Sequence, residues 1–209
     1  HNVVRALKNS FATTLLQTFA ALAVSSIAGY GFEIYHDKAK DTVMAILMLA
    51  MMVPFVAVLV PLFQMFTKAK LINSWTGFIL PSIATPFLIM YFRNSARSFP
   101  RDTLEAARID GLNEFQIFIR MFIPMMKPTY ASAATITFMG AWNAYLWPKV
   151  VMQTNEAITM PMLVANTMGG YVIDYGVVMA AVTICSLPTV IIFFCLQKSF
   201  TNAVAGAVK

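Results

Sequence analysis

Residues 104–124, with the sequence LEAARIDGLNEFQIFIRMFIP, form the most polar long segment of a chain that is otherwise mostly apolar. Charged side chains occur throughout this segment and its neighbours: Arg93, Arg97, Arg101, Asp102, Glu105, Arg108, Asp110, Glu114, Arg120 and Lys127. Apolar blocks of membrane-spanning length flank it on both sides. Because a hydrophilic insert of this length cannot sit in lipid, we expect it to project into water between two spans.

The first half of this polar segment carries the signals of a short helix. Pro100 suits the first turn of a helix, and Asp102 followed three residues later by Glu105 fits an N-terminal capping box. The helix is expected to end near Asp110, because Gly111 is a natural left-handed terminator.

The second half predicts another helix after a tight turn. Asn113 and Gln116 form a second capping signal, and Pro124 is expected to close the run. Four apolar residues share one face at helical spacing: Phe115, Phe118, Ile119 and Phe122. In the first helix, Ala106 and Ala107 keep one side small enough for another backbone to approach. The whole segment is therefore predicted to be a compact helix–turn–helix knob.

Composition places the chain among integral membrane proteins. It has 209 residues, of which 59% are hydrophobic and 11% charged, and its mean hydropathy is +0.70, whereas soluble domains average about 25% charged residues. Cys185 and Cys195 would lie about 15 Å apart on one helix, too far for a disulfide. His1 and His36 lie at the terminus and in a loop, so no catalytic or metal-ligating constellation is predicted around them.

The expected fold class is all-α, a polytopic bundle of transmembrane helices. About 20 residues suffice for each crossing. The predicted spans cover residues 9–31, 42–66, 75–92, 129–147 and 172–196, and the polar loop covers residues 97–127. Several spans contain proline, which frees backbone carbonyls and kinks a helix: Pro54, Pro61, Pro81, Pro86 and Pro188.

The distribution of basic residues predicts the orientation. One side of the predicted bundle carries the polar loop and Lys38, Lys40, Arg93, Arg97, Arg101, Arg108, Arg120, Lys127, Lys198 and Lys209. The other side carries only Arg5, Lys8, Lys68, Lys70 and Lys149. Because positive charge concentrates on the cytoplasmic side, the polar loop is expected to be cytoplasmic, and the net charge of +6 needs no nucleic-acid partner.

The spans lack the parts of a self-powered transporter. All nine acidic residues lie in loops or at span ends, whereas ion-coupled transporters carry ionisable relays inside the membrane. No G-x-x-x-x-G-K-[ST] loop occurs, so the chain has no phosphate-binding loop for ATP. A transporter of this composition therefore needs energy from another chain.

The polar segment also resembles the EAA loop of binding-protein-dependent ABC importer permeases. That pattern is EAA, three residues, Gly, nine residues, and Ile-x-Leu-Pro. Its fixed positions are matched here by Glu105, Ala106, Ala107, Gly111, Met121, Ile123 and Pro124. Only Met121 and Ile123 depart from it, both as apolar replacements. The segments NSFATTLL, ILPSIATPFLIMYFR, GAWNAYLWP, ITMPMLV and GAVK are similar to the sugar-importing branch, of the type of the maltose importer's smaller permease subunit.

The resemblance implies a permease of the bacterial cytoplasmic membrane that catalyses nothing itself and moves solute by alternating access. Implied partners are a second permease subunit, two ATPase subunits that hold ATP and Mg²⁺, an extracytoplasmic solute-binding protein, a sugar and membrane lipid, but no nucleic acid. Family members have one more span before this point, so the chain is expected to lack an N-terminal span. The implied ATPase-coupling residues are Glu105, Ala106, Ala107, Asp110, Gly111 and Pro124. For Glu105, the alternative is that it only completes the capping box.

A second group of candidates concerns the substrate pathway. Gly140, Asn143 and Trp147 are expected on one face of the fourth span, with Tyr145 beside them. Sugars are bound by neutral hydrogen-bonding groups and by aromatic rings, so these residues are candidates to line a pathway. The alternative is an interfacial aromatic belt with helix-packing glycine.

The stretch from residue 151 to 171 is too polar to span a membrane. It contains Thr159, Pro161, Gly169 and Gly170, and the resemblance implies that it reaches toward the solute-binding protein. The alternative is an ordinary solvated loop. The tail at residues 206–209 is expected either to reach between the ATPase subunits or to be frayed.

Three other functions compete with a sugar permease. An ABC permease for another solute, such as glycerol phosphate, would share the same polar loop. A secondary transporter is disfavoured because no carboxylate lies within a predicted span. A membrane enzyme is least favoured, because no acid–base pair or metal-ligand cluster occurs at membrane depth.

Overall fold

The computed structural model describes residues 2–169 and 173–206, with side chains as far as Cys195, and all regular structure in these residues is helical. The expectation of an all-α fold is confirmed. In chain order the elements are α1 (Asn2–Ile34), α2 (Lys38–Ala50), α3 (Phe55–Lys68), α4 (Trp75–Ile79), η1 (Leu80–Ser82), α5 (Pro86–Ala96), α6 (Arg101–Ile109), α7 (Glu114–Ile117), η2 (Phe118–Phe122), α8 (Ile123–Met125), α9 (Lys127–Trp142), α10 (Leu146–Val151), η3 (Asn155–Ala157), α11 (Met160–Thr167) and α12 (Tyr175–Gly206).

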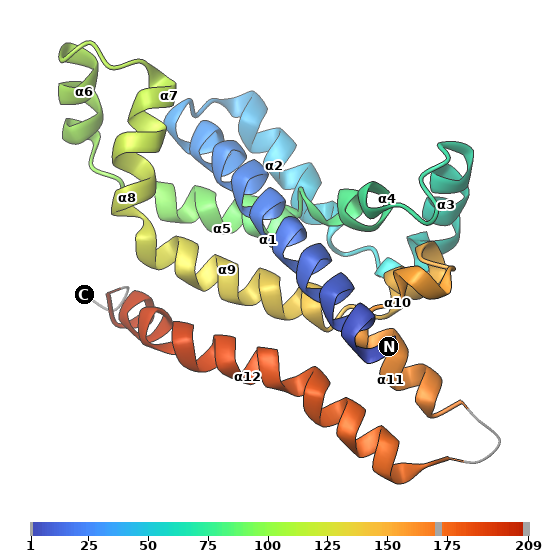
Figure 1. Cartoon of the computed structure of the whole chain (residues 1–209). Helices are drawn as coiled ribbons and strands as arrows, with labels where there is room; N and C mark the ends of the chain where they lie inside the picture. Colours follow the sequence, from blue (N-terminus) through green and yellow to red (C-terminus); the bar gives the residue numbers. More distant parts are fainter. Residues whose placement is uncertain (1, 170–172, 207–209) are drawn as a thin grey trace.

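Helix α1 is the central rod of the molecule and packs against α5, α9 and α11 (Figure 1). Its buried face is small and polar, with Ser10, Thr13, Thr14, Gln17, Thr18, Ser25 and Ser26. Its exposed face carries large apolar side chains, including Leu15, Leu16, Phe19, Val24 and Ile27. This arrangement, apolar outside and small or polar inside, is typical of a helix that packs against other helices within lipid.

The closest approach between α1 and α5 occurs at Gly29. A Cβ atom placed there would lie 2.6 Å from the Cβ of Phe92 and 2.7 Å from the backbone nitrogen of Arg93. Any side chain would therefore force the two helices apart. Gly31, two residues later, would meet nothing within 4 Å, so that position has room for a side chain.

Two of the predicted spans are bent pairs of helices rather than single rods. Helices α2 and α3 meet at 102°, and the α4–η1 segment meets α5 at 50°. Proline kinks were expected within the spans over residues 42–66 and 75–92, and each bent pair is long and apolar enough in total to form one broken span. Pro54 is extended at the start of α3. Thr85 is extended before Pro86, because the residue before a proline avoids helical geometry. Helix α1 and residues Tyr175–Cys195 of α12 are each long and apolar enough to cross a membrane.

The region after α9 also differs from expectation. The predicted span over residues 129–147 ends early, because α9 stops at Trp142 and a new helix, α10, begins at Leu146. The stretch expected to be a loop contains η3 and α11. Helix α12 continues to Gly206 with Pro188 inside it. The predicted start of the last span at Val172, and tail residues 207–209, lie outside the described residues.

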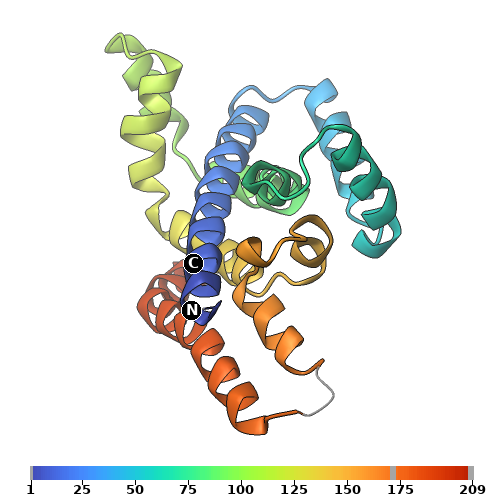
Figure 2. The same cartoon turned by 45° about the vertical axis from the view of Figure 1, so that its right-hand side comes forward.

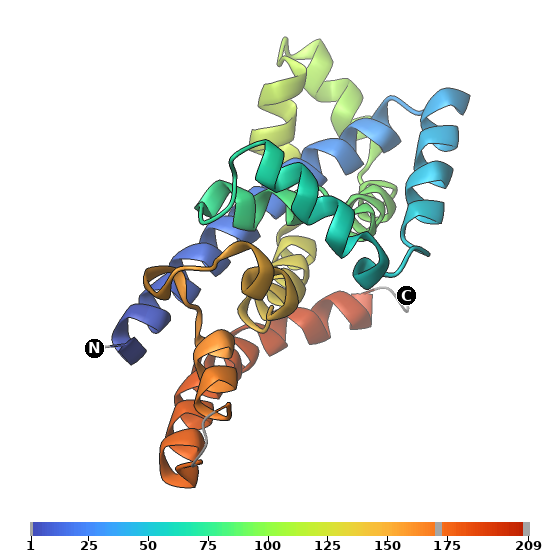
Figure 3. The same ribbon diagram turned by 90° about the vertical axis from the view of Figure 1, so that its right-hand side faces the viewer.

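The molecule has two distinct ends, one on each side of the bundle (Figures 1, 2 and 3). Residues 101–125, from α6 to α8, project at one end and are called the knob below. The N-terminus of α1, with α10 and α11, lies at the opposite end (Figure 1). Helix α12 runs back along α9 from the opposite end toward the knob end (Figure 1).

Candidate functional site

Helix α6 presents a mixed outer surface to solvent and an apolar inner surface to the knob. Glu105, Ala106 and Asp110 are exposed. Leu104 and Ala107 are 2% and 1% exposed and belong to the knob's apolar core. The expectation that both alanines lie on the outside is therefore wrong for Ala107. Residues three apart share a helix face, so Leu104 and Ala107 turn inward together and leave Ala106 as the small outer residue.

The predicted end of α6 is confirmed, but the predicted capping box at its start is wrong. Gly111 has φ of +80°, which confirms the left-handed terminator. The capping box of Asp102 and Glu105 is wrong, because Pro100 occupies the cap and makes no side-chain hydrogen bond. Asp102 lies inside the first turn, where its charge still favours the positive end of the helix dipole.

The capping box that begins α7 is confirmed. The Gln116 backbone nitrogen donates to Asn113 Oδ1 at 2.9 Å, and the Asn113 nitrogen donates to Gln116 Oε1 at 3.0 Å. This reciprocal pair fixes the start of the second helix directly after the turn at Gly111.

The helix that follows contains a π-helical turn, η2, that the sequence pattern did not predict. Phe118 and Phe122 are buried as expected, but Phe115 is 70% exposed and Ile119 is 43% exposed. Pro124 does not close the run, since helix continues to Met125. A proline clashes with the carbonyl four residues earlier, and a wider turn just before it relieves that clash and shifts the buried face.

The knob also exposes two large apolar side chains: Ile109, which is not among the predicted site residues, and Phe115, which was expected on the apolar face of the second helix. Ile109 is 86% exposed at the end of α6, and Phe115 lies just beyond the turn. Ile109 lies off the buried stripe of Leu104 and Ala107, and this is the signal that could have identified it, whereas the periodicity wrongly predicted Phe115 to be buried. Large apolar residues on a water-facing projection indicate a protein contact surface.

A polar cluster holds the knob against the end of α1. Glu114 accepts hydrogen bonds from Arg108 Nε at 2.8 Å and from the Tyr30 hydroxyl at 3.4 Å. Burial opposes ionisation of Glu114, yet the hydrogen bonds from Arg108 and Tyr35 and the charge of Arg108 hold the pKa of its carboxyl below the usual value. The Tyr30 ring packs edge-on against Phe118 and Phe122. The knob is thus fixed to α1 by both charge and aromatic contacts.

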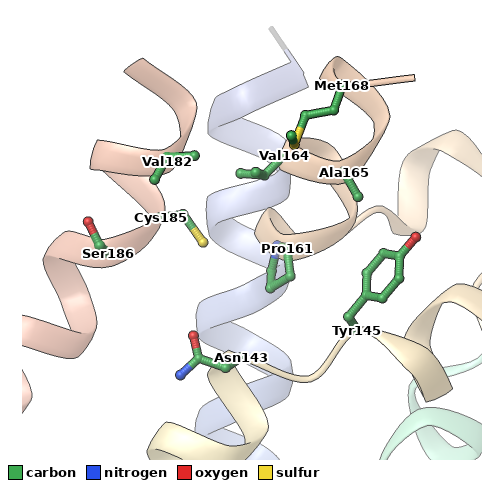
Figure 4. A pocket seen from close by; sticks show the side chains of 9 residues that line it. All are labelled: Asn143, Tyr145, Pro161, Val164, Ala165, Met168, Val182, Cys185 and Ser186. Atoms are coloured by element: carbon green, nitrogen blue, oxygen red, sulfur yellow. The ribbon is translucent and has the colours of Figure 1, made fainter. Parts of the chain in front are cut away.

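A separate pocket of about 390 Å³ lies between the end of α9, α11 and α12 (Figure 4). Its lining is Asn143, Tyr145, Pro161, Val164, Ala165, Met168, Val182, Cys185 and Ser186. The pocket joins two predicted pathway residues, Asn143 and Tyr145, to Pro161 of the predicted binding-protein loop. Val182, Cys185 and Ser186 were missed, because nothing in the sequence places α12 opposite α11.

The other predicted pathway residues have different surroundings. Trp147 is 7% exposed, and its indole nitrogen donates to the carbonyl oxygens of Gly77 at 3.2 Å and Phe78 at 3.1 Å. The expectation that it shares a helix face with Gly140 and Asn143 is wrong, since α9 ends before Asn143. Gly140 is exposed on α9 and does not line the pocket. Trp147 is therefore a packing residue.

The residues predicted to face the solute-binding protein also have different surroundings. Thr159 is 4% exposed, so it cannot meet a partner in this conformation and its expected role is corrected. The neighbouring Met160 nitrogen donates to Ser10 Oγ at 2.7 Å, which ties this segment to α1. Gly169 lies just after α11, and Gly170 lies outside the described residues. Within residues 2–169 and 173–206, no group of three His, Cys, Asp or Glu is placed to hold a metal.

Comparisons with known proteins agree on one relationship. The family model described as "Binding-protein-dependent transport system inner membrane component" matches residues 21–206. The lactose transport system permease protein LacG of Rhizobium radiobacter is 41% identical over 201 residues, which cover 96% of this chain and 74% of that protein. The arabinooligosaccharides transport system permease protein AraQ of Bacillus subtilis (strain 168) is 35% identical over 202 residues, covering 96% and 72%. A chain from the crystal structure of a bacterial ABC transporter involved in alginate import shares the fold with a TM-score of 0.85 at 21% identity, covering 96% of this chain and 76% of that chain.

Proposed function

The chain belongs to the family of binding-protein-dependent transport system inner membrane components, and on that premise we propose that it forms half of the translocation pathway for a sugar or oligosaccharide. Family membership makes it a multi-pass permease subunit of an ABC importer, not an enzyme, and implies a partner ATPase and a solute-binding protein.

The observation that carries the proposal is the outer surface of the knob. Glu105, Ala106, Ile109 and Phe115 are exposed on a projection that stands clear of the bundle. A small residue between a carboxylate and two apolar side chains suits a shallow socket with a basic rim. We assign this surface to a cytoplasmic ATPase subunit, one of two that hold ATP and Mg²⁺, with Asp110 and Gly111 setting the end of α6.

The substrate assignment is supported by the pocket beside α11. Its polar groups are neutral, namely the Asn143 amide and the Tyr145 and Ser186 hydroxyls, which is the chemistry that recognises a sugar. Two relatives are named for lactose and for arabinooligosaccharides. In this proposal the pocket forms part of the pathway, and residues 161–169 face the solute-binding protein.

Alternating access is proposed to use the bends of the bundle. A second permease subunit would complete the pathway. The helices change direction at the breaks between α2 and α3 and between η1 and α5. ATP-driven closure of the ATPases would move the knob and tilt the helices attached to it.

The docking surface is tested by paired substitutions on adjacent residues. In the complete complex in proteoliposomes, Ala106→Trp should abolish solute uptake while the amount of assembled bundle stays unchanged, because Ala106 is exposed. Ala107→Trp should instead reduce the amount of folded protein, because Ala107 is buried. Wild-type uptake by Ala106→Trp would overturn the docking assignment.

A second candidate solute is glycerol phosphate. The sn-glycerol-3-phosphate permease protein UgpE of Pectobacterium atrosepticum is 27% identical over 207 residues, covering 97% of this chain and 73% of that protein. Against it, none of the residues lining the pocket is cationic, and a phosphate group favours arginine or lysine. Competition of labelled oligosaccharide uptake by glycerol phosphate decides between the two solutes.

A further inference from the structure

We propose that Glu33, at the end of α1, is the positioning residue through which movement of α6 reaches the membrane bundle. This inference rests on the proposed function, because it takes α6 to be the surface that the ATPase moves. Glu33 lies outside the predicted coupling residues, and the structure places it beneath the knob.

Glu33 lies at the centre of three arginines. Its Oε2 atom is 3.3 Å from Arg93 Nε and 3.3 Å from Arg97 Nε, and its Oε1 atom is 3.9 Å from Arg101 Nη2. Arg101 Nη2 also donates to the Glu33 backbone oxygen at 3.5 Å. One carboxylate therefore contacts the body of α5, the end of α5 and the first residue of α6.

The three arginines recur at intervals of four residues across the break at Pro100. Pro100 interrupts the helix between Arg97 and Arg101, so the chain itself provides no rigid rod from α6 into α5. Glu33 bridges this break from the outside. The ion pairs of Glu33 therefore link α6 directly to α1 and α5. A movement of α6 can pass through these ion pairs as well as through the connecting loop.

The three arginines around Glu33 differ in burial: Arg93 is buried, whereas Arg97 and Arg101 are more than half exposed. The Arg93 side chain is 5% exposed and that of Glu33 is 12% exposed, whereas Arg97 and Arg101 are 56% and 54% exposed. Arg93 is also held by Asp41 Oδ1 of α2 at 2.5 Å. A buried carboxylate that loses its partner is strongly disfavoured, so the two outer arginines can exchange on Glu33 while Arg93 remains.

The test is the number of solute molecules imported per ATP hydrolysed by the complete complex in proteoliposomes. We expect Glu33→Gln to lower this ratio about tenfold, a typical size for the loss of a coupling interaction, since a neutral amide attracts the three arginines less strongly. The control Arg120→Gln removes one exposed charge of the knob and should leave the ratio at the wild-type value. A change that merely reduced the amount of folded protein would lower uptake and hydrolysis together.

A second variant covers the case in which Glu33→Gln fails to assemble. The double substitution Arg97→Gln/Arg101→Gln removes only half-exposed partners and keeps the buried Glu33–Arg93 pair. It should also lower the ratio, and Asp41→Asn, which leaves all contacts of Glu33 in place, should lower it less. An unchanged ratio in the double variant would overturn the proposal.

A cross-link separates failure of this inference from failure of the proposed function. The Glu105→Cys variant should form a disulfide with a cysteine introduced in the ATPase subunit of the same complex. If the cross-link forms and the ratio stays at the wild-type value, the proposed role of Glu33 is wrong but docking is right. If no cross-link forms at any ATPase position, the docking assignment fails first.

Discussion

The two ends of the molecule are held together by different chemistry. At the knob end, Glu33 and Glu114 are surrounded by Arg93, Arg97 and Arg108. At the opposite end, hydrogen bonds between neutral groups predominate, and one charged donor, Lys149 Nζ, bonds to Asn166 Oδ1 at 3.1 Å. The neutral hydrogen bonds are donated by Asn9 Nδ2 to the Glu156 and Ile158 oxygens, by Gln153 nitrogen to Asn73 Oδ1, by Asn73 nitrogen to the Val151 oxygen, and by the Trp147 indole to the Gly77 and Phe78 oxygens.

This difference shows how each end can respond to force. A hydrogen bond weakens steeply when its distance or donor angle departs from the preferred range, so we expect the opposite end to keep one arrangement. Glu33 has several arginines around it. If the knob moves and one arginine leaves, another can still pair with the carboxylate, so no charge is left unpaired. We expect the knob end to respond to salt and acid and the opposite end to respond chiefly to changes in packing.

The largest expected effect is at the opposite end. Trp147→Ala removes a buried indole that contacts Phe66 edge-on and should cost about 3–5 kcal/mol of stability. Trp147→Phe keeps most of the ring and loses only the hydrogen bonds, so its cost should be about 1–3 kcal/mol. Thermal inactivation of the solubilised complex measures both. Equal loss in the two variants would show that hydrogen bonds, not packing, dominate this end.

The next effect concerns the helix crossing near the knob. Gly29→Leu should destabilise the bundle by about 1–3 kcal/mol or more, since the side chain would overlap Phe92 and the α5 backbone. Gly31→Leu is the matched control, because nothing lies within 4 Å of its Cβ position. The yield of monodisperse complex after heating compares them. If Gly31→Leu were as damaging as Gly29→Leu, the crossing would not be the cause.

The smallest effect is the acid response of the knob. The pKa of Glu114 is lowered in the folded state, so this carboxylate stabilises the knob above its unfolded pKa and loses that contribution as pH falls through the folded pKa. The Glu114 side chain is 40% exposed, so the contribution is about 1 kcal/mol or less. Exchange protection of the knob amides should fall below about pH 4.5, and Glu114→Gln should remove the pH dependence. Amides of α10 provide the internal control and should show no matching change.

Local signals in the sequence were strong where a few adjacent residues decide the structure. The Asn113–Gln116 capping box and the left-handed Gly111 both formed as predicted, because their hydrogen bonds and dihedral angles depend on neighbours in the chain. Predictions that extrapolated a helical face failed. Phe115, just before the π-helical turn, and Ile119, within it, are exposed, and Trp147 does not share a face with Gly140 because α9 ends early.

By itself, the sequence determined an all-α membrane protein with a polar helix–turn–helix projection, because apolar block length and local capping chemistry are written in consecutive residues. Only the tertiary structure decided that Ala107 is buried while Ala106 is exposed, that Asn143 and Tyr145 share a pocket with α12, and that Glu33 meets three arginines of α5 and α6. These facts join residues far apart in the chain. They depend on which helices lie side by side, and the periodicity of each helix alone does not contain that information.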